Sequence, residues 1–287
     1  ETPRPQAKEA RLQDFGLNRK LSLEIIANVE KVIVGKSAAV ELGVVALMCQ
    51  GHALIEDVPG VGKTMLARSI ARSTGCEFKR IQFTPDLLPS DITGVSIYNQ
   101  KSGEFEFRQG PIISQIVLAD EVNRATPKTQ SAMLEAMEEH QVTAGGQRHV
   151  LPEPFFVLAT QNPIEQEGTY PLPEAQVDRF MLKVRVDYPS RDEERDIVNM
   201  ITGEPIPSIS PVIEPQQLLD ARQVVRRIYV DDRVKEYVLD LVLADRHHVR
   251  VVDQDVGGHE DRIGEQADVR GVGAVAGRLV LELGHPV

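Results

Sequence analysis

The sequence contains little of several residue types, and each scarcity argues against a class of protein. With two cysteines, Cys49 and Cys76, in 287 residues, the chain has neither a disulfide framework nor a cysteine-based metal motif, so we expect both to be core thiols. Tryptophan is absent and aromatic residues make up 5% of the chain, which argues against a surface that stacks on bases. No apolar run approaches the roughly 18 residues of a membrane span, and no signal peptide is recognisable. These absences favour a soluble, cytoplasmic protein without a membrane span.

Basic residues are also in the minority. The chain has 32 lysines and arginines against 43 aspartates and glutamates, a net charge of −11, which argues weakly against nucleic acid as a partner. The length predicts roughly two domains, and a hydrophobic fraction of 41% is sufficient for an ordinary core. Residues 1–20, which begin with a polar stretch containing Pro3 and Pro5, are predicted to be a flexible leader. The start at Glu1 rather than Met indicates a piece of a longer protein.

A phosphate-binding loop is the most informative motif. Residues 57–64 read D-V-P-G-V-G-K-T, follow the apolar run 53–55 and open an amphipathic stretch at 65–71. The pattern G-x-x-x-x-G-K-[ST] fits except at Asp57, where glycine is expected. The competing interpretation, a chance Gly-Lys-Thr turn, is disfavoured by the strand–loop–helix context. The segment therefore predicts a nucleotide triphosphatase.

The residues of this loop have distinct roles in holding a phosphate chain. Gly60 and Gly62 lack Cβ atoms, so backbone N–H groups can wrap the phosphates, while Lys63 supplies positive charge to them. Thr64 supplies a hydroxyl to Mg²⁺, and the helix that follows points its positive end at the anion. The predicted nucleotide-binding residues of the loop are Pro59, Gly60, Val61, Gly62, Lys63 and Thr64.

Strands and helices alternate along the chain. Strands are predicted at 53–56, 78–83, 116–119, 155–159 and 180–186, and helices at 21–34, 37–49, 63–73 and 127–139. Such alternation predicts an α/β fold in which helices flank a mostly parallel sheet, with sites at the carboxyl ends of the strands. Two segments, 91–111 and 141–151, interrupt it with hairpin signatures around Gly103 and Gly145. We interpret these hairpins as inserts that make contacts rather than as inserts without a function.

Several polar residues near strand ends are candidates for chemistry. Asp120 can hold the hydration shell of Mg²⁺, and Glu121 can polarise a water for in-line attack on a γ-phosphate. Arg124 follows them and is either part of the site or a solvated loop charge. Asn162 can orient the attacking water, although an Asn-Pro dipeptide also marks a turn. Arg179 can stabilise charge on the transferred phosphoryl group, including that of a neighbouring subunit; a surface Asp–Arg pair is the alternative.

Taken together, these motifs resemble those of the AAA+ ATPases, and most closely those of the MoxR family. The resemblance is carried by residues 56–64, 118–125, 159–163 and 170–180, which agree in order and spacing within about 21–200. Asp57 is unusual for a general phosphate loop, but an aspartate at this position is typical of the MoxR family. The stretch 33–36 looks like the family's entrance to the adenine pocket, which adds Val34 and Gly35 to the expected nucleotide-binding residues.

The resemblance implies an architecture and an assembly. It implies an AAA+ core at 21–188 with a five-stranded parallel sheet of order 5-1-4-3-2, two hairpin inserts, and a hexameric ring with ATP and Mg²⁺ at subunit interfaces. Glu121 would be the catalytic base, Asn162 would contact the γ-phosphate, and Arg179 would reach the neighbouring subunit's γ-phosphate. MoxR-like ATPases are similar to chaperones that remodel or mature a protein client, often with a von Willebrand factor A domain protein as partner.

The α-helical lid expected after the core is only partly recognisable. Residues 189–246 have the helical pattern of its start. Residues 247–287 contain no Lys, Ser, Thr, Phe or Tyr and show no sustained period, so the expected Pro-Arg motif is missing. We interpret this atypical tail as a frame-shifted or otherwise corrupted segment, with a natural divergent end as the alternative. Its histidines form no convincing ligand set, and without a lid arginine efficient hydrolysis by this chain does not follow from the family.

Three functional hypotheses follow from these residues. The leading one is an Mg²⁺-dependent ATPase that uses hydrolysis to move a protein client. The alternative is a nucleic-acid-associated AAA+ motor, which the acidic net charge and few aromatics disfavour. A metabolic kinase or GTPase is the third; the chain has no Asn-Lys-x-Asp base-reading motif, and the Asp120–Glu121 pair suits hydrolysis better than transfer.

Overall fold

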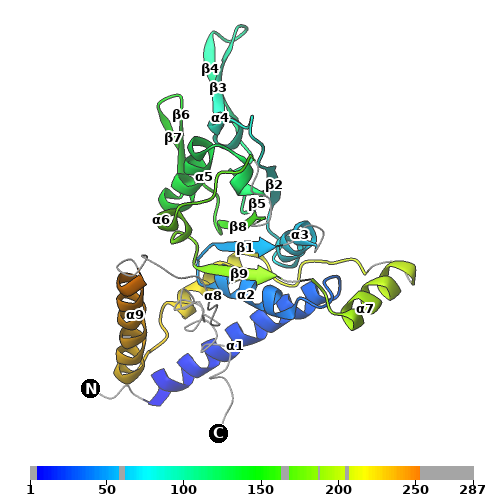
Figure 1. Cartoon of the computed structure of the whole chain (residues 1–287), viewed down its shortest axis with the longest axis vertical. Coiled ribbons are helices and arrows are strands. Elements are labelled where there is room, and N and C mark those ends of the chain that lie inside the picture. Colours follow the sequence, from blue (N-terminus) through cyan, green and yellow to red (C-terminus); the bar gives the residue numbers. More distant parts are fainter. Residues whose placement is uncertain (1–4, 58–61, 163–167, 187, 204–206, 253–287) are drawn as a thin grey trace.

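A five-stranded parallel sheet forms the centre of the protein (Figure 1). The computed structural model describes residues 5–57, 62–162, 168–186, 188–203 and 207–252. The sheet consists of β1 (Ala53–Asp57), β2 (Phe78–Gln82), β5 (Ile116–Asp120), β8 (Phe156–Gln161) and β9 (Leu182–Val186). Its order is β2-β5-β8-β1-β9, and all neighbouring strands are parallel. Numbered along the chain, these strands have the predicted order 5-1-4-3-2, which is confirmed.

Burial on both faces explains why the central strands are apolar. All five residues of β5 and five of the six residues of β8 are buried, as expected for parallel strands covered on both sides. In β1, Ala53 and Ile55 join one apolar cluster and Leu54 joins the other, because successive side chains of a strand point to opposite faces. The edge strand β2 instead exposes Lys79 and Arg80. The sheet is thus a two-sided core with one polar edge.

On one side of the sheet lie α2 (Ser37–Met48) and α3 (Lys63–Ser73), with α1 (Pro5–Glu30) packed on both. The first helix differs from the sequence prediction of 21–34: it begins earlier, at Pro5, and ends earlier, at Glu30. Asn18 is buried, and its Nδ2 donates to the carbonyl oxygen of Ala221 at 2.8 Å. The structure therefore replaces the expected flexible leader with helix over residues 5–20.

The opposite side of the sheet is covered by α5 (Pro127–Glu139). The buried residues of this helix include Met133, Leu134 and Met137, which recur at helical spacing and join the second apolar cluster. Three short elements that the sequence did not predict accompany it: α4 (Pro89–Thr93), the 3₁₀ turn η1 (Val122–Arg124) and α6 (Glu174–Val177). Of these, η1 directly follows Glu121 of the candidate site described below.

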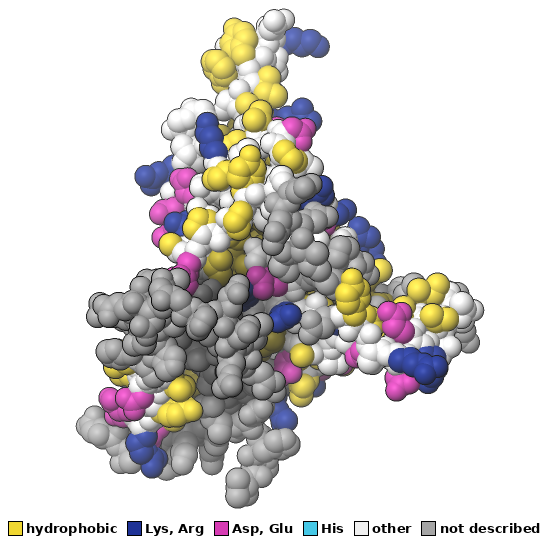
Figure 2. Space-filling view, viewed as in Figure 1, with side chains coloured by type: hydrophobic (Ala, Val, Ile, Leu, Met, Phe, Trp, Pro, Cys, Tyr) yellow, Lys and Arg dark blue, Asp and Glu magenta, His cyan; other side chains and the backbone are white. Residues whose placement is uncertain are grey.

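Both predicted hairpins are present, and they project from the same end of the molecule (Figure 1). The pairs are β3 (Gly94–Asn99) with β4 (Glu104–Gln109), and β6 (Gln141–Ala144) with β7 (Gln147–Val150). The rings of Phe107 and His149 stack between the hairpins with centroids 3.6 Å apart. Tyr98 and Phe105 are 53% and 73% exposed, and Figure 2 shows apolar side chains along this projection. That the two hairpins serve to make contacts stays a prediction.

The segment after the sheet is helical, with α7 (Arg191–Thr202), α8 (Pro215–Val225) and α9 (Asp232–Val252). Helix α8 packs on α1 and α2, whereas α7 and α9 lie on opposite sides of the molecule in Figure 1 and do not form one compact bundle. Helix α9 continues across the predicted boundary at 246–247, and residues 253–287 of the atypical tail lie outside the described residues. In the described part of the chain, no helix is both long and apolar enough to cross a membrane.

Candidate functional site

Parallel pairing brings the carboxyl ends of β2, β5 and β8 to one edge of the sheet. Gln82 of β2 lies opposite Asp120 of β5, and the register of β5 with β8 ends at Ala119 opposite Ala159, one residue before Asp120 and Thr160. Strand β1 lies on the other side of β8, with Ile55 opposite Thr160. The sheet order therefore places the acidic pair and the start of the phosphate loop on either side of β8.

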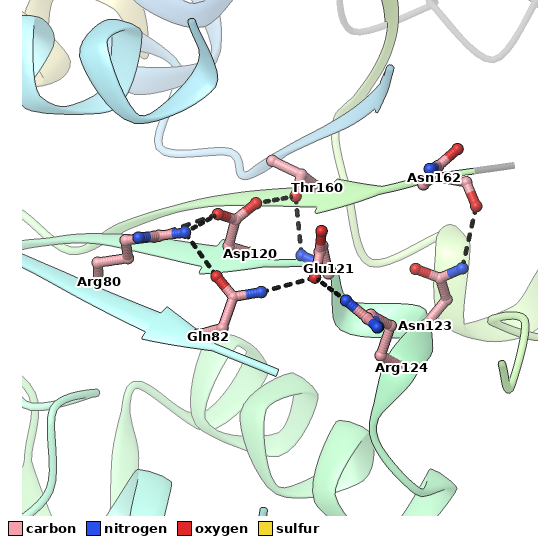
Figure 3. Close-up of polar contacts among 8 residues, drawn as sticks. All are labelled: Arg80, Gln82, Asp120, Glu121, Asn123, Arg124, Thr160 and Asn162. Atoms are coloured by element: carbon pink, nitrogen blue, oxygen red, sulfur yellow. Dashed lines mark hydrogen bonds and ion pairs between the residues drawn. The ribbon is translucent and has the colours of Figure 1, made fainter. Parts of the chain in front are cut away.

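A buried hydroxyl joins the two acidic residues (Figure 3). Thr160 Oγ1 donates to Asp120 Oδ1 at 2.6 Å and accepts from the main-chain N–H of Glu121 at 2.9 Å. Thr160 is fully buried and Asp120 is 7% exposed. Glu121 has a φ of 56°, a left-handed conformation that is uncommon for residues with a Cβ atom. Thr160 thus helps to hold the turn that sets the position of the Glu121 side chain.

The Glu121 carboxylate is held by two donors. Gln82 Nε2 and Arg124 Nη1 both donate to Glu121 Oε2, at 2.7 and 2.8 Å. The Glu121 side chain is 30% exposed, and both donors bind its Oε2 atom. The interpretation of Arg124 as a merely solvated loop charge is wrong, since its guanidinium pairs with Glu121.

Arg80 on the edge strand β2 belongs to the same network and was not predicted as a site residue. Its Nε and Nη2 donate to Asp120 Oδ2 at 3.1 and 2.7 Å. Nη2 also donates to Gln82 Oε1 at 2.5 Å. The side chain of Arg80 is 46% exposed and that of Asp120 only 11%. The guanidinium therefore compensates the negative charge of a largely buried carboxylate from the solvent side.

The phosphate loop leads into the first turn of α3. Gly62 is the N-cap with a φ of 84°, and Lys63 and Thr64 are the first two helical residues. A positive φ of this kind is readily adopted only by glycine, so a residue with a Cβ atom would be strained at the start of this helix. The predicted ligands Pro59, Gly60 and Val61 lie outside the described residues.

A pocket adjoins this helix start. It is lined by Ile33, Lys36, Ala39, Ile55, Gly62, Lys63, Leu66 and Val186. Val34 and Gly35, the predicted adenine-pocket residues, lie between two of these lining residues in the connection from α1 to α2. A Cβ atom added to Gly35 would lie 2.6 Å from Glu193 Cδ. The start of α7 therefore packs against the connection that borders the pocket.

The structure places Asn162 near the acidic pair and Arg179 away from it. Asn162 is 5% exposed, and its main-chain oxygen accepts from Asn123 Nδ2 at 3.1 Å. Arg179 instead pairs with Glu138 of α5 at 2.9 Å. It follows α6, which lies on the other side of the sheet from α3 in Figure 1. A hollow of about 230 Å³ is lined by Ser131, Leu134, Glu135, Glu138, Glu139, Gln176 and Arg179.

Comparison with known proteins agrees with this geometry. Residues 52–182 match the profile of the ATPase family associated with various cellular activities (AAA). An uncharacterised protein, YeaC, of Bacillus subtilis is 54% identical over 227 residues, which cover 79% of this chain and 71% of that protein. Chaperone MoxR1 of Mycobacterium tuberculosis is 45% identical over 231 residues, covering 80% of this chain and 61% of the chaperone.

A solved structure is also similar. The crystal structure of a protein from Cytophaga hutchinsonii, proposed to be an ATPase, is 41% identical with a TM-score of 0.75, covering 83% of this chain and 72% of that one. The chain belongs to the MoxR family of AAA+ ATPases. It spans only part of the length of its MoxR relatives, and the alternative of a nucleic-acid motor is not favoured by them.

The oxygen donors of this MoxR-family protein fit the predicted magnesium site. Thr64 supplies a hydroxyl and Asp120 a carboxylate, both hard ligands of the kind that Mg²⁺ prefers in nucleotide sites, where phosphates and waters complete its shell. In the described part of the chain, no group of three or more His, Cys, Asp or Glu side chains could hold a metal by itself. Asp120 already bonds to Thr160 and Arg80, so contact through water is the better fit.

The site residues that sequence analysis missed are Arg80, Gln82, Asn123 and Thr160. Each acts by bonding to a predicted residue or its neighbour. Thr160 lies in a stretch that carried the resemblance, but nothing in the sequence marked its hydroxyl. Arg80 and Gln82 are found only once β2 is paired with β5 in the observed register.

Proposed function

We propose that this MoxR-family protein is an Mg²⁺-dependent ATPase that hydrolyses ATP at the interfaces of a hexameric ring and uses the energy to remodel or mature a protein client. The observation that carries the proposal is the Asp120–Glu121 pair at the edge of the sheet, joined through Thr160 to the strand that leads to Asn162. Since the reaction consumes ATP, we propose the cytoplasm as its compartment. A von Willebrand factor A domain protein is the proposed partner, on the basis of the family.

Each residue has a part in this proposal. The phosphate loop, Pro59 to Thr64, binds the phosphates, and Lys63 supplies the positive charge nearest the β- and γ-phosphates. Bound Mg²⁺ would neutralise phosphate charge, with Thr64 and Asp120 as its side-chain ligands, Asp120 through water. Glu121 accepts a proton from the attacking water through Oε1, and Asn162 orients that water. Val34 and Gly35 border the adenine.

Arg179 acts on the neighbouring subunit in this proposal. Its ion pair with Glu138 holds it on the outer side of α5, and its side chain is 38% exposed. From such a surface a guanidinium can enter a neighbour's site, where it would stabilise charge on the γ-phosphate. The ion pair with Glu138 would then be exchanged for the phosphate when the ring forms.

We also propose the domain division 21–188 for the core, 189–246 for the start of the lid and 247–287 for an atypical tail. Helix α1 extends the core towards residue 5. The tail is a frame-shifted or otherwise altered segment, or else a divergent end. The coding DNA distinguishes these origins, because a shifted frame beyond codon 246 should restore a Pro-Arg motif in the first case and not in the second.

The test of the proposed function is Glu121→Gln. The amide cannot accept a proton from water, so ATP binding should persist while hydrolysis falls by about 10²-fold or more. Fluorescent-nucleotide titration and phosphate release measure the two quantities. The matched control is Glu77→Gln, at the opposite end of β2, where the carboxylate pairs only with Lys79 among the described residues. Equal hydrolysis by the two variants would show that Glu121 is not the base.

A further inference from the structure

Gln130 is a fully buried polar residue on the first half of α5. Its Nε2 donates to the carbonyl oxygens of Val122, Ala125 and Tyr170, at 3.1, 3.1 and 2.8 Å. Three carbonyl acceptors require the amide nitrogen to face them, which settles the orientation of the side chain. An amide nitrogen carries two hydrogens, so at least one of them is shared between two carbonyls.

The first two carbonyls belong to the turn that carries the acidic site. Val122 directly follows Glu121 and begins η1, and Ala125 caps the end of η1. Arg124 lies within this turn and donates to the Glu121 carboxylate at 2.8 Å. Gln130 therefore fixes both ends of the turn from which the Glu121 side chain is supported.

The third carbonyl belongs to the segment that leads to Arg179. The main-chain N–H of Tyr170 donates to the carbonyl oxygen of Asn123 at 2.6 Å, so η1 and this segment are bonded directly as well as through Gln130. Further along the segment, Leu172 and Phe180 are buried in the same apolar cluster as Val122. The route from Glu121 to the region of Arg179 is thus continuous and packed.

Helix α5 also holds the far end of this route. Its Glu138 pairs with Arg179 at 2.9 Å. Gln130 and Glu138 are eight residues apart, about 12 Å along a helix that rises about 1.5 Å per residue. One rigid helix therefore supports the proposed base at one end and the proposed neighbour-directed arginine at the other.

In the described part of the chain, the buried amide of Gln130 is only partly hydrogen-bonded. Among the described residues, its Oε1 is buried without a hydrogen-bond partner, as is Oδ1 of Asn123 in η1. An unmade hydrogen bond of this kind destabilises the folded state, whereas the bonds from Nε2 stabilise it by satisfying carbonyl oxygens. What an amide supplies at this position is a donor that joins η1 to the Tyr170 segment.

We propose that Gln130 is a positioning residue that couples the two halves of the catalytic machinery: it sets Glu121 for the subunit's own ATP and Arg179 for the neighbour's. This inference rests on the proposed function. Movement of η1 shifts the Tyr170 segment through the shared amide, so the state of one site is transmitted to the next. Gln130 is fully buried and its amide nitrogen bonds to main-chain carbonyls, so it acts through the backbone that it holds.

The first test is Gln130→Met, which keeps the length of the side chain and removes its donors. ATP affinity should stay within about twofold, while kcat should fall by about tenfold or more, because displacements on the order of 1 Å can reduce the rate by about 10²-fold. The control is Thr129→Val. Thr129 is also buried on α5, and its hydroxyl donates to the carbonyl oxygen of Leu87 at 2.7 Å, away from the Tyr170 segment. Unchanged kcat in Gln130→Met, or an equal fall in both variants, overturns the inference.

The second test uses mixed rings made by co-expression. Glu121→Gln and Arg179→Ala subunits are each inactive alone, but together they regain activity if one subunit's base works with its neighbour's arginine. Gln130→Met subunits should regain activity with neither partner, because their own base and their arginine are both displaced. Recovery with either partner shows that Gln130 serves only one end and overturns the coupling. If Glu121→Gln and Arg179→Ala subunits fail to complement each other, Arg179 does not act on the neighbouring subunit, and the proposed coupling is wrong as well.

Discussion

Thr160 is a single buried hydroxyl on which two acidic residues depend. Its oxygen serves as donor to Asp120 and as acceptor for the N–H of Glu121. The latter bond supports a residue whose φ of 56° lies in the left-handed region, where an L-residue is disfavoured by sterics. The hydroxyl therefore contributes both to the charge balance of the Asp120 carboxylate and to the geometry of Glu121, the proposed base.

We expect Thr160→Val to affect catalysis and stability together. The methyl group leaves the Glu121 N–H and one Asp120 oxygen without their partner, which should lower the free energy of unfolding by about 1–3 kcal/mol. Because Glu121 would no longer be held in its turn, kcat should fall by about tenfold or more. Urea unfolding and phosphate release measure the two effects. Thr160→Ser keeps the hydroxyl and should retain most of the rate; an equally slow serine variant would contradict the role given to the hydrogen bonds.

His52 is a buried histidine whose two ring nitrogens are both used. Nδ1 accepts from the N–H of Val157 at 3.0 Å, and Nε2 lies 3.4 Å from the carbonyl oxygen of Met137. The neutral ring suits this pair, with one acceptor and one donor. Burial lowers the pKa of His52 to about 4 from its ordinary 6.5, and His140 and Arg222 add smaller effects in the same direction.

This shift predicts a loss of stability in acid. Between about pH 6.5 and pH 4 the unfolded chain binds a proton that the folded protein excludes, so stability is full above this range and is lost as the pH falls through it. The loss approaches about 3 kcal/mol for a shift of this size. His52→Asn can still accept from Val157 but does not titrate, so its unfolding free energy should depend less on pH in this range. Parallel pH profiles for the two proteins would exclude His52 as the cause.

The sequence predicted those site residues whose role depends on their immediate neighbours in the chain. Lys63, Thr64 and Asp120 stand in contiguous motifs whose spacing reflects the chemistry of one loop or one strand end. Arg80 and Gln82 contribute through cross-strand contacts, and a shift of one residue in the register would remove both. No short-range pattern encodes that register, because it depends on the packing of the whole sheet.

At the scale of elements, the alternation of apolar strands and amphipathic helices predicted α3 and α5 with their observed bounds. Both helices have apolar residues at helical spacing and clear starts. Helix α1 was predicted only from residue 21, because its first half is polar and its apolar spacing begins late. Its packing on α8, through contacts such as the one from Asn18 to Ala221, is tertiary and cannot be read from local periodicity.

The two hairpins project together, and the stacked rings of Phe107 and His149 connect them. Phe107 and His149 are nearly parallel, with an interplanar angle of 13°, and Ser96 of β3 lies against the turn of the second hairpin at Gly145. Stacked ring pairs contribute about 0.5–1.5 kcal/mol beyond their buried area. The second hairpin is short, so this contact should matter for its order.

We therefore predict that Phe107→Ala loosens the second hairpin selectively. Amide exchange in β6 and β7 should quicken by about twofold to tenfold, the equivalent of that stacking contribution. The control is Phe105→Ala on the same strand, since Phe105 is 73% exposed and its ring pairs with Tyr98 of its own hairpin. Hydrogen–deuterium exchange resolved by peptide measures both variants. Similar exchange of β6 and β7 in the two variants would mean that the stacked rings do not connect the hairpins.

At the scale of the whole molecule, the segment after the sheet is docked back onto the core by buried polar contacts. Asn28 of α1 donates to the carbonyl oxygen of Ser210 at 2.9 Å. Arg222 of α8 is 3% exposed, and its Nε donates to the carbonyl oxygen of Leu47, in the last turn of α2, at 2.9 Å. A cation at the carboxyl end of a helix is favourable because it meets unpaired carbonyl dipoles. Burial lowers the pKa of Arg222 to about 10, so the guanidinium stays protonated at neutral pH.

Arg222 should therefore be the main polar anchor of α8. Arg222→Ala removes a buried side chain and its hydrogen bond to the Leu47 carbonyl, and we expect the free energy of unfolding to fall by about 2–4 kcal/mol. Amides of α8 should exchange faster than those of the central strands, because the docking is lost before the sheet opens. Arg226→Ala is the matched control, since Arg226 lies at the same end of the helix, is exposed and bonds to the Gln50 side chain; surface contacts of this kind contribute less than about 1 kcal/mol. Equal losses in the two variants would show that α8 is held by its apolar face alone.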